Sequence, residues 1–187
     1  MLAAEIAVAV LAAGRSTRFV SDKLMVSLDG FPLGAHVGKI IAPIGFGWRF
    51  AICREGTPLA SYFEALGFNV VANAAPEAGQ ALSLHLAVQA AEQTDAKALL
   101  VTLADMPFVT RRHIAAVAAG DGLTASSDGF TPSPPALFPR SYWPLLLATR
   151  GDKGARALLD EACFVTATPD ELRDIDVADD LPRPNSQ

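Results

Sequence analysis

Short apolar runs alternate along the chain with segments of helical character. The apolar runs, which are rich in valine, alanine, leucine and isoleucine, predict buried strands at residues 6–11, 49–53, 69–72 and 98–103. The intervening and following segments predict helices over residues 33–41, 58–66, 79–92 and 110–119. Strands that alternate with helices in this way form a largely parallel sheet covered on both faces. The pattern therefore predicts a three-layer α/β fold with a mostly parallel sheet.

The pattern loosens after Gly122. A turn-rich stretch at residues 126–129 is followed by Pro132, Pro134 and Pro135, which predicts a loop that borders a site or an excursion from the sheet. Two further helices are expected at residues 141–147 and 153–161, with a last strand at 164–167. Because no repeat or composition shift divides the chain, we expect one domain over residues 1–187, with a frayed tail from Pro182.

Composition and charge narrow the classes of function. The chain has 187 residues, of which 51% are hydrophobic, and a formal net charge of -5, the wrong sign for a protein that neutralises a nucleic-acid backbone. The apolar amino-terminal run has no basic residues before it and contains Glu5, and no later run is long enough to span a membrane. Cys53 and Cys163 lack metal-ligand spacing, and both side chains are expected to be buried in the protein core. Two free thiols of this kind suit a reducing compartment. These features predict a soluble cytoplasmic protein with neither nucleic acid nor membrane as a partner.

The first candidate site is the loop that follows the first predicted strand. Leu11, Ala12, Ala13 and Gly14 end the strand with small residues that allow close approach to backbone amides, and Arg15, Arg18 and Lys23 add positive charge. Amides and cations together suit a polyphosphate. The segment matches neither the Walker loop nor the GxGxxG motif. A basic surface turn is the alternative interpretation.

The second candidate site is Asp105, in the sequence Leu-Ala-Asp-Met-Pro directly after the strand predicted at residues 98–103. In open α/β sheets, ligands bind beyond the carboxyl ends of the strands. A carboxylate there could hold a hard cation together with phosphate oxygens. The alternative is that Asp105 only caps the following turn.

Together these motifs resemble the molybdenum cofactor nucleotidyltransferases, and most closely their cytidylyltransferase branch. The resemblance rests on Leu-Ala-Ala-Gly-x-Ser-x-Arg-(x)4-Lys-Leu from Leu11 and on Leu-Ala-Asp-Met-Pro from Leu103. Four later segments also resemble the family: Asn73-(x)5-Gly79-(x)3-Ser83-Leu84, residues 135–138, residues 151–156 and residues 174–180. The six segments occur in the family's order over nearly the whole chain.

The resemblance implies a Rossmann-like nucleotidyltransferase fold and a set of roles. Residues 11–14, with Arg15 and Ser83, would bind the nucleotide, and Arg18 and Lys23 would contact the triphosphate. Asp105 would hold Mg²⁺, with Asp176 as a weaker candidate for a second metal contact. The implied reaction transfers CMP from CTP to molybdopterin and releases pyrophosphate, and a molybdoenzyme would receive the product. Ala13, where the guanylyl branch usually has glycine, favours cytosine.

Several positions depart from the family pattern. Phe19 and Val20 stand where glycine is usual, so either the loop follows another path or turnover is weakened. Ala81 and His85 replace a common serine and arginine, Ser133-Pro134 replaces Gly-His, and Val177 replaces threonine. Two alternatives therefore stay open: a transferase of the same fold that acts on a sugar or polyol phosphate, and a non-catalytic module that holds nucleotide or pterin for a molybdoenzyme.

Overall fold

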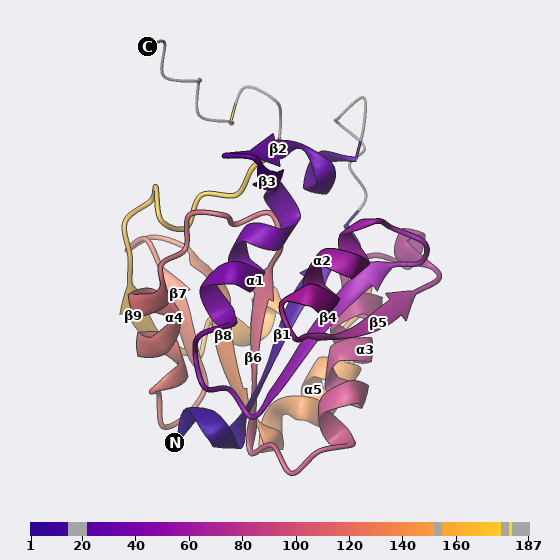
Figure 1. Cartoon of the computed structure of the whole chain (residues 1–187). Coiled ribbons are helices and arrows are strands. Elements are labelled where there is room, and N and C mark those ends of the chain that lie inside the picture. Colours follow the sequence, from indigo (N-terminus) through magenta and orange to yellow (C-terminus); the bar gives the residue numbers. More distant parts are fainter. Residues whose placement is uncertain (15–21, 152–154, 177–179, 181–187) are drawn as a thin grey trace.

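A central β-sheet organises the molecule (Figure 1). The computed structural model describes residues 1–14, 22–151, 155–176 and 180. Within these residues the sheet has seven strands in the order β5-β4-β1-β6-β8-β7-β9. The strands are β1 (Ile6–Ala12), β4 (Trp48–Arg54), β5 (Asn69–Asn73), β6 (Ala98–Leu103), β7 (Thr124–Ser127), β8 (Pro132–Pro139) and β9 (Cys163–Thr166). A separate short hairpin consists of β2 (Ser27–Leu28) and β3 (Phe31–Pro32).

The strand β1 lies at the centre of the sheet and pairs in parallel with β4 on one side and β6 on the other. All seven of its residues are buried, because alternate side chains enter the two cores of the protein. Val8 and Val10 enter one core, and Ala7 and Ala9 enter the other. Only β8 runs antiparallel to its two neighbours among the described strands. The sheet is therefore mostly parallel, as predicted.

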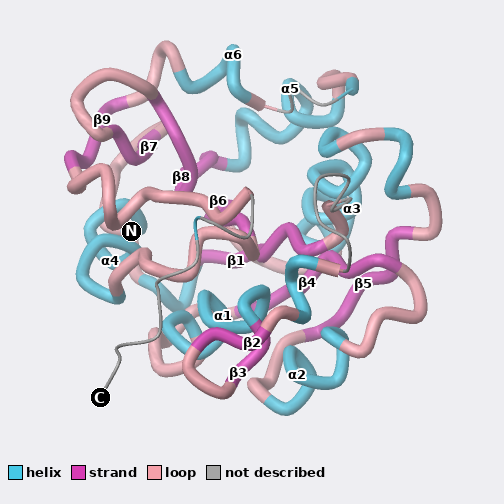
Figure 2. The backbone as a smooth tube through the Cα atoms, turned by 90° about the horizontal axis from the view of Figure 1, so that it is seen from above, coloured by secondary structure: helices cyan, strands magenta, loops and turns pink. Residues whose placement is uncertain are grey.

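Helices cover both faces of the sheet (Figure 2). One face carries α1 (His36–Ile41), α2 (Leu59–Ala65) and α4 (Arg111–Ala118), and the other carries α3 (Gln80–Glu92), α5 (Trp143–Leu147) and α6 (Arg156–Leu159). Short 3-10 turns complete the described elements: η1 (Ala3–Glu5), η2 (Lys23–Met25), η3 (Leu33–Ala35), η4 (Pro76–Ala78) and η5 (Arg140–Tyr142). This arrangement is the predicted three-layer α/β fold. No helix among the described residues is both long and apolar enough to cross a bilayer.

The ends of the helices follow local chemistry. Thr110 begins α4, and its side chain accepts a hydrogen bond from the His113 backbone amide. Gly67 ends the α2 segment with a φ of 79°, a left-handed conformation that favours glycine. The described part of the helix predicted at residues 153–161 is the shorter α6. The tail predicted to fray from Pro182 lies outside the described residues.

Two sequence-based expectations are wrong. The segment expected to be a loop bordering a site or an excursion from the sheet forms β7 and β8 instead, and only residues 128–131 between these strands form a loop. Proline is tolerated there because the β7–β8 register shifts between Ala125 and Ser126, opposite Pro134 and Pro135, where regular ladder bonds are interrupted. Cys163 is exposed on β9, whereas Cys53 is buried as expected and burial raises the pKa of its thiol to about 12.

Candidate active site

Three side chains from distant parts of the sequence meet beyond the carboxyl ends of β1 and β6. The Lys23 ammonium in η2 lies 2.9 Å from Asp105 Oδ2 and 3.1 Å from Asp176 Oδ1. The Lys23 side chain is only 10% exposed, while those of Asp105 and Asp176 are 23% and 48% exposed. One buried cation therefore joins the two carboxylates that the sequence analysis assigned to metal binding. Asp105 does more than cap the turn that follows β6.

Titration behaviour in this cluster reflects both burial and neighbouring charge. Burial lowers the pKa of Lys23, but the charges and hydrogen bonds of Asp105 and Asp176 outweigh it, so the net shift is upward. Burial raises the pKa of the nearby Asp174, and the negative charges of Asp176 and Asp105 raise it further. The two carboxylates thus keep the Lys23 side chain protonated. A further negative charge in this cluster is unfavourable unless a cation binds with it.

A second ion pair fixes the position of Lys23. Asp22 precedes η2, and its carboxylate accepts a hydrogen bond from the Leu24 amide at 3.2 Å. The other oxygen of Asp22 accepts from Arg54 Nη2, at the end of β4, over 2.6 Å. Arg54 was not among the predicted site residues, although its place at the carboxyl end of a predicted strand was a signal. Through Asp22, β4 sets the position of the turn that carries Lys23.

A cavity of about 380 Å³ opens beside the cluster. Its lining includes six of the predicted site residues: Leu11, Ala13, Gly14, Lys23, Ser83 and Asp105. Ala12 is buried within β1 and pairs with Cys53 in the sheet, so it is not part of this lining. Arg15, Arg18, Phe19 and Val20 lie outside the described residues. Glu77 and Gln80 also line the cavity, and the sequence analysis did not single them out.

The far wall of this cavity is formed by the beginning of α3. Gly79 precedes the helix with a φ of 91°, a backbone conformation that favours glycine. Ser83 follows one turn into the helix and is 5% exposed. Its hydroxyl oxygen accepts a hydrogen bond at 3.0 Å from Asn73, a fully buried residue at the end of β5. The sheet thereby fixes the side chain that faces the cavity from α3.

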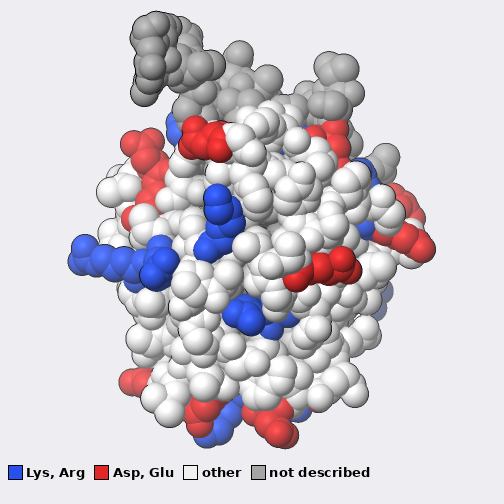
Figure 3. Space-filling view, in the orientation of Figure 1, with Lys and Arg blue, Asp and Glu red and all other residues white. Residues whose placement is uncertain are grey.

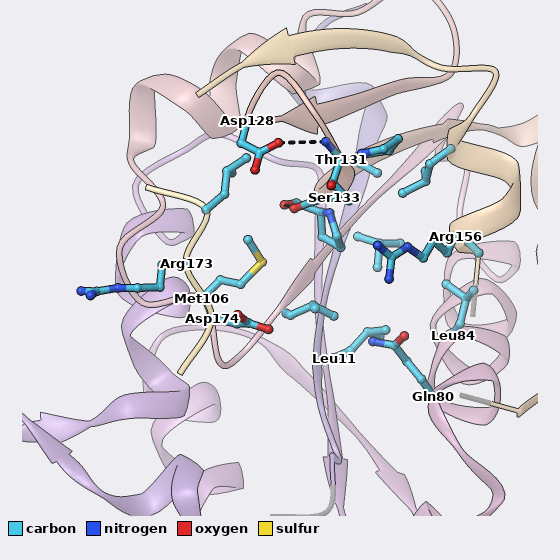
Figure 4. A pocket seen from close by; sticks show the side chains of 18 of the residues that line it. Leu11, Gln80, Leu84, Met106, Asp128, Thr131, Ser133, Arg156, Arg173 and Asp174 are labelled. Atoms are coloured by element: carbon cyan, nitrogen blue, oxygen red, sulfur yellow. Dashed lines mark hydrogen bonds between the residues drawn. The ribbon is translucent and has the colours of Figure 1, made fainter. Parts of the chain in front are cut away.

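A larger cavity, of about 720 Å³, adjoins the first (Figure 4). Leu11, Gln80 and Leu103 line both cavities, so the two spaces meet at these residues. Most of the larger lining is apolar: Leu84, Val101, Met106, Pro132, Pro134, Ala136, Phe138, Ala155, Leu159, Pro169 and Leu172. The β7–β8 turn forms part of the rim, where the Asp128 carboxylate accepts from the Thr131 amide at 2.8 Å. The cavity suits a ligand with a broad apolar or aromatic body.

Five of the described residues that line the larger cavity are charged: Asp128, Arg156, Asp170, Arg173 and Asp174. Arg156 of α6 points into it, and Asp174 points toward it from the opposite side (Figure 4). Arg173 turns outward, and its guanidinium lies 4.7 Å from the centre of the Phe108 ring. No ion pair or hydrogen bond of the Arg156 side chain is found among the described residues. Arg156 is therefore placed to receive a negatively charged group of a ligand.

Charged side chains are unevenly distributed over one face of the molecule. On the face drawn in Figure 3, lysine, arginine and acidic side chains are scattered in small groups over a largely uncharged surface. This distribution agrees with the net charge of -5.

The fold is that of a nucleotidyltransferase. The chain belongs to the family with a MobA-like NTP transferase domain, whose model matches residues 8–167. It is 27% identical over 186 residues to the purine catabolism protein PucB of Bacillus subtilis, covering 93% of this chain and 90% of PucB.

Solved structures have the same fold. A nucleotidyl transferase from Methanothermobacter superposes with a TM-score of 0.77 at 22% identity, over 94% of this chain and 93% of that one. Rv0371c of Mycobacterium tuberculosis, in a complex with manganese, gives a TM-score of 0.73 at 22% identity, over 94% of this chain and 95% of that one. The predicted nucleotidyltransferase fold is confirmed.

Proposed function

We propose that the protein transfers CMP from CTP to the phosphate group of molybdopterin, which forms molybdopterin cytosine dinucleotide. The observation that carries the proposal is the convergence of Lys23, Asp105 and Asp176 beside the smaller of two adjoining cavities. The smaller cavity, bounded by Ala13, Gly14 and Ser83, would take the nucleotide. The larger cavity would take the pterin.

The proposed reaction is a single displacement at phosphorus. A phosphate oxygen of molybdopterin forms a bond to the α-phosphorus of CTP while the bond from that phosphorus to the bridging oxygen of the β-phosphate breaks. Pyrophosphate leaves with the electron pair of the broken bond. Because the attacking phosphate is already ionised near neutral pH, the reaction needs alignment and charge neutralisation more than a protein base. Lys23 would stabilise the leaving phosphates, assisted by Arg15 and Arg18 of the preceding loop.

The donor groups in the cluster fit a divalent cation. The carboxylates of Asp105 and Asp176 approach the same ammonium group, so they face a common position, and oxygen ligands are those that Mg²⁺ prefers. We propose that these two residues hold Mg²⁺ when the nucleotide is bound. The ion would neutralise phosphate charge there. The manganese complex of Rv0371c supports a divalent cation in this fold.

The larger cavity favours molybdopterin over the alternative acceptors. A sugar or polyol phosphate carries many hydroxyl groups, and each would need a hydrogen-bond partner when buried. The lining is apolar around Leu84, Met106 and Phe138, where hydroxyl groups would lack partners and a fused heterocycle would bury its faces. Polar lining residues, such as Gln80, Thr131 and Ser133, would bind the edge of the heterocycle. Arg156 would bind a negative charge on the same ligand.

The similarity to PucB supports a biological setting. Its name places that relative in purine catabolism. We propose that the product of this protein is passed to a molybdoenzyme in such a route.

The deciding experiment measures pyrophosphate release with CTP, GTP or ATP, each in the presence of molybdopterin and Mg²⁺. Release with CTP, and little with the other two, supports the proposal. Preference for GTP would overturn the cytidylyl assignment, and activity only with sugar phosphates would overturn the acceptor. Tight binding of CTP and pterin without pyrophosphate release would identify a non-catalytic binding module.

A further inference from the structure

The buried Asn73 side chain has only one orientation that satisfies its hydrogen bonds. Its Oδ1 accepts from the Ala75 backbone amide at 3.0 Å, so the other end of the side chain must be the amide nitrogen. That nitrogen donates to the Ser83 hydroxyl oxygen, also at 3.0 Å. Asn73 is completely buried and therefore has no water with which to exchange these bonds.

This arrangement determines what Ser83 offers to a ligand. One lone pair of its oxygen is engaged by Asn73, and its own hydrogen has no acceptor among the described residues. A helical serine often donates to the carbonyl one turn earlier, as Thr94 does to Ala91 at the end of α3, but no such bond is found for Ser83. Ser83 lines the smaller cavity, so its hydroxyl hydrogen is free to be donated into that space.

We infer that Asn73 is a positioning residue that makes Ser83 a hydrogen-bond donor to an acceptor atom of the bound nucleotide, such as a phosphate, ribose or base carbonyl oxygen. This inference rests on the proposed function, because it assigns the smaller cavity to the nucleotide. In this role Asn73 touches no ligand itself. It determines whether the Ser83 hydroxyl group donates or accepts a hydrogen bond at the nucleotide.

The polarity can be reversed with almost no change in shape. In Asn73→Asp, one carboxylate oxygen still accepts from the Ala75 amide, while the other replaces the donor and accepts the Ser83 hydrogen. Ser83 then presents lone pairs to the nucleotide. The new negative charge also weakens binding, so the single variant is not sufficient. Ser83→Ala, made in both backgrounds, separates the two effects because it measures what the hydroxyl contributes in each.

The experiment is calorimetric titration of CTP, with GTP in parallel, in Mg²⁺ buffer. The pH is about 8, well above the ordinary pKa of an aspartate, because burial raises the pKa of a carboxyl group. In the wild-type background, Ser83→Ala should weaken binding roughly 3- to 30-fold, as expected for loss of one hydrogen bond. In the Asn73→Asp background it should change binding less than about twofold. Asn69→Asp, the same change at the exposed beginning of β5, is the matched control and should leave binding unchanged.

Equal losses from Ser83→Ala in both backgrounds overturn the inference. Failure of the wild-type protein to bind any nucleoside triphosphate overturns the proposed function as well, which distinguishes the two failures. If Asn73→Asp does not fold, Asn73→Ala removes the donor without burying a charge. Ser83→Ala should then cost less than it does in the wild type, and an unchanged cost counts against the inference.

Discussion

The Lys23 ammonium donates a hydrogen bond to Asp105 Oδ2 over 2.9 Å, although the two residues are 82 positions apart in the chain. The family resemblance implies ligands of opposite charge for these two residues: a phosphate anion for Lys23 and a metal cation for Asp105. In the structure each neutralises the other. Binding of a nucleotide with its cation would therefore exchange this ion pair for two new ones, Lys23 with phosphate and Asp105 with the cation.

Lys23→Met tests this exchange. The substitution keeps the length and apolar packing of the side chain but removes its charge. We expect CTP affinity to fall roughly 10- to 100-fold because a charged phosphate contact is lost. Affinity for Mn²⁺ alone should rise, because Asp105 and Asp176 no longer share a cation. Calorimetry measures both, and Lys97→Met, which breaks a pair with Glu5 at the amino end of β6, should alter neither.

Asp105→Asn should leave the fold intact and reduce Mg²⁺-dependent turnover by roughly a hundredfold or more. The amide keeps the shape of the carboxylate and loses the charge that would hold the cation. Pyrophosphate release gives the turnover, and a thermal melt reports folding. Asp121→Asn makes the same change at an exposed position and should retain full activity. If Asp105→Asn turned over at the wild-type rate, the assignment of Asp105 as a metal ligand would be wrong.

The sequence predicted the layers of the fold and the central residues of the candidate site because both depend on local patterns. Apolar runs identify β1 and β6, and candidate residues cluster where such strands end. The sequence did not predict β8, since the register shift that accommodates Pro134 and Pro135 is visible only in the paired strands.

Arg54 was not predicted from the sequence, and Asn73 was named only as part of a family motif without a role. Each acts through one partner, Asp22 or Ser83, and the contact with that partner is not visible in the sequence. A polar residue at the end of a buried strand was the available signal. Contacts between such strand ends and the loops above them are set by tertiary packing, which spacing along the chain does not encode.

Arg54→Ala should raise the KM for CTP roughly 3- to 10-fold with a smaller effect on kcat. Loss of the 2.6 Å contact leaves the Asp22 carboxylate without its ion pair to β4. The turn that carries Lys23 is then held less firmly in position. The cost in stability should stay below about 1 kcal/mol, because the Arg54 side chain is 40% exposed and solvent screens the pair. Steady-state kinetics and a thermal melt test both statements. Arg112→Ala, at an exposed position on α4, is the control.

We expect the free energy of unfolding to decrease in acid because of the buried side chain of His113. Burial lowers the pKa of His113 below its ordinary value of 6.5, although the Glu171 charge opposes the shift. As the pH falls below that value, the unfolded chain binds a proton that the folded protein does not, so the free energy of unfolding decreases. His113→Gln should flatten the dependence of melting temperature on pH between about pH 7 and about pH 5.

A control separates titration from hydrogen bonding at this position. His113 Nε2 lies 2.7 Å from the Ser126 hydroxyl oxygen, and glutamine can supply a comparable donor. Ser126→Ala removes the hydrogen bond but keeps the histidine, so it should retain the wild-type pH dependence at a lower melting temperature. Equal pH dependence in His113→Gln and the wild type would show that another group is responsible.

Arg156→Ala should weaken pterin binding and leave CTP binding unchanged. The guanidinium points into the larger cavity, where it is placed to meet an anionic group of the acceptor (Figure 4). Because Arg156 is exposed and solvent screens its charge, the KM for molybdopterin should rise roughly 3- to 10-fold. Arg156→Lys keeps the charge without the planar group and should recover part of the loss. Arg111→Ala, at an exposed position on α4, should match the wild type in both measurements. Equal losses for CTP and pterin would indicate damage to the fold, and an unchanged pterin KM would mean that the acceptor does not reach Arg156.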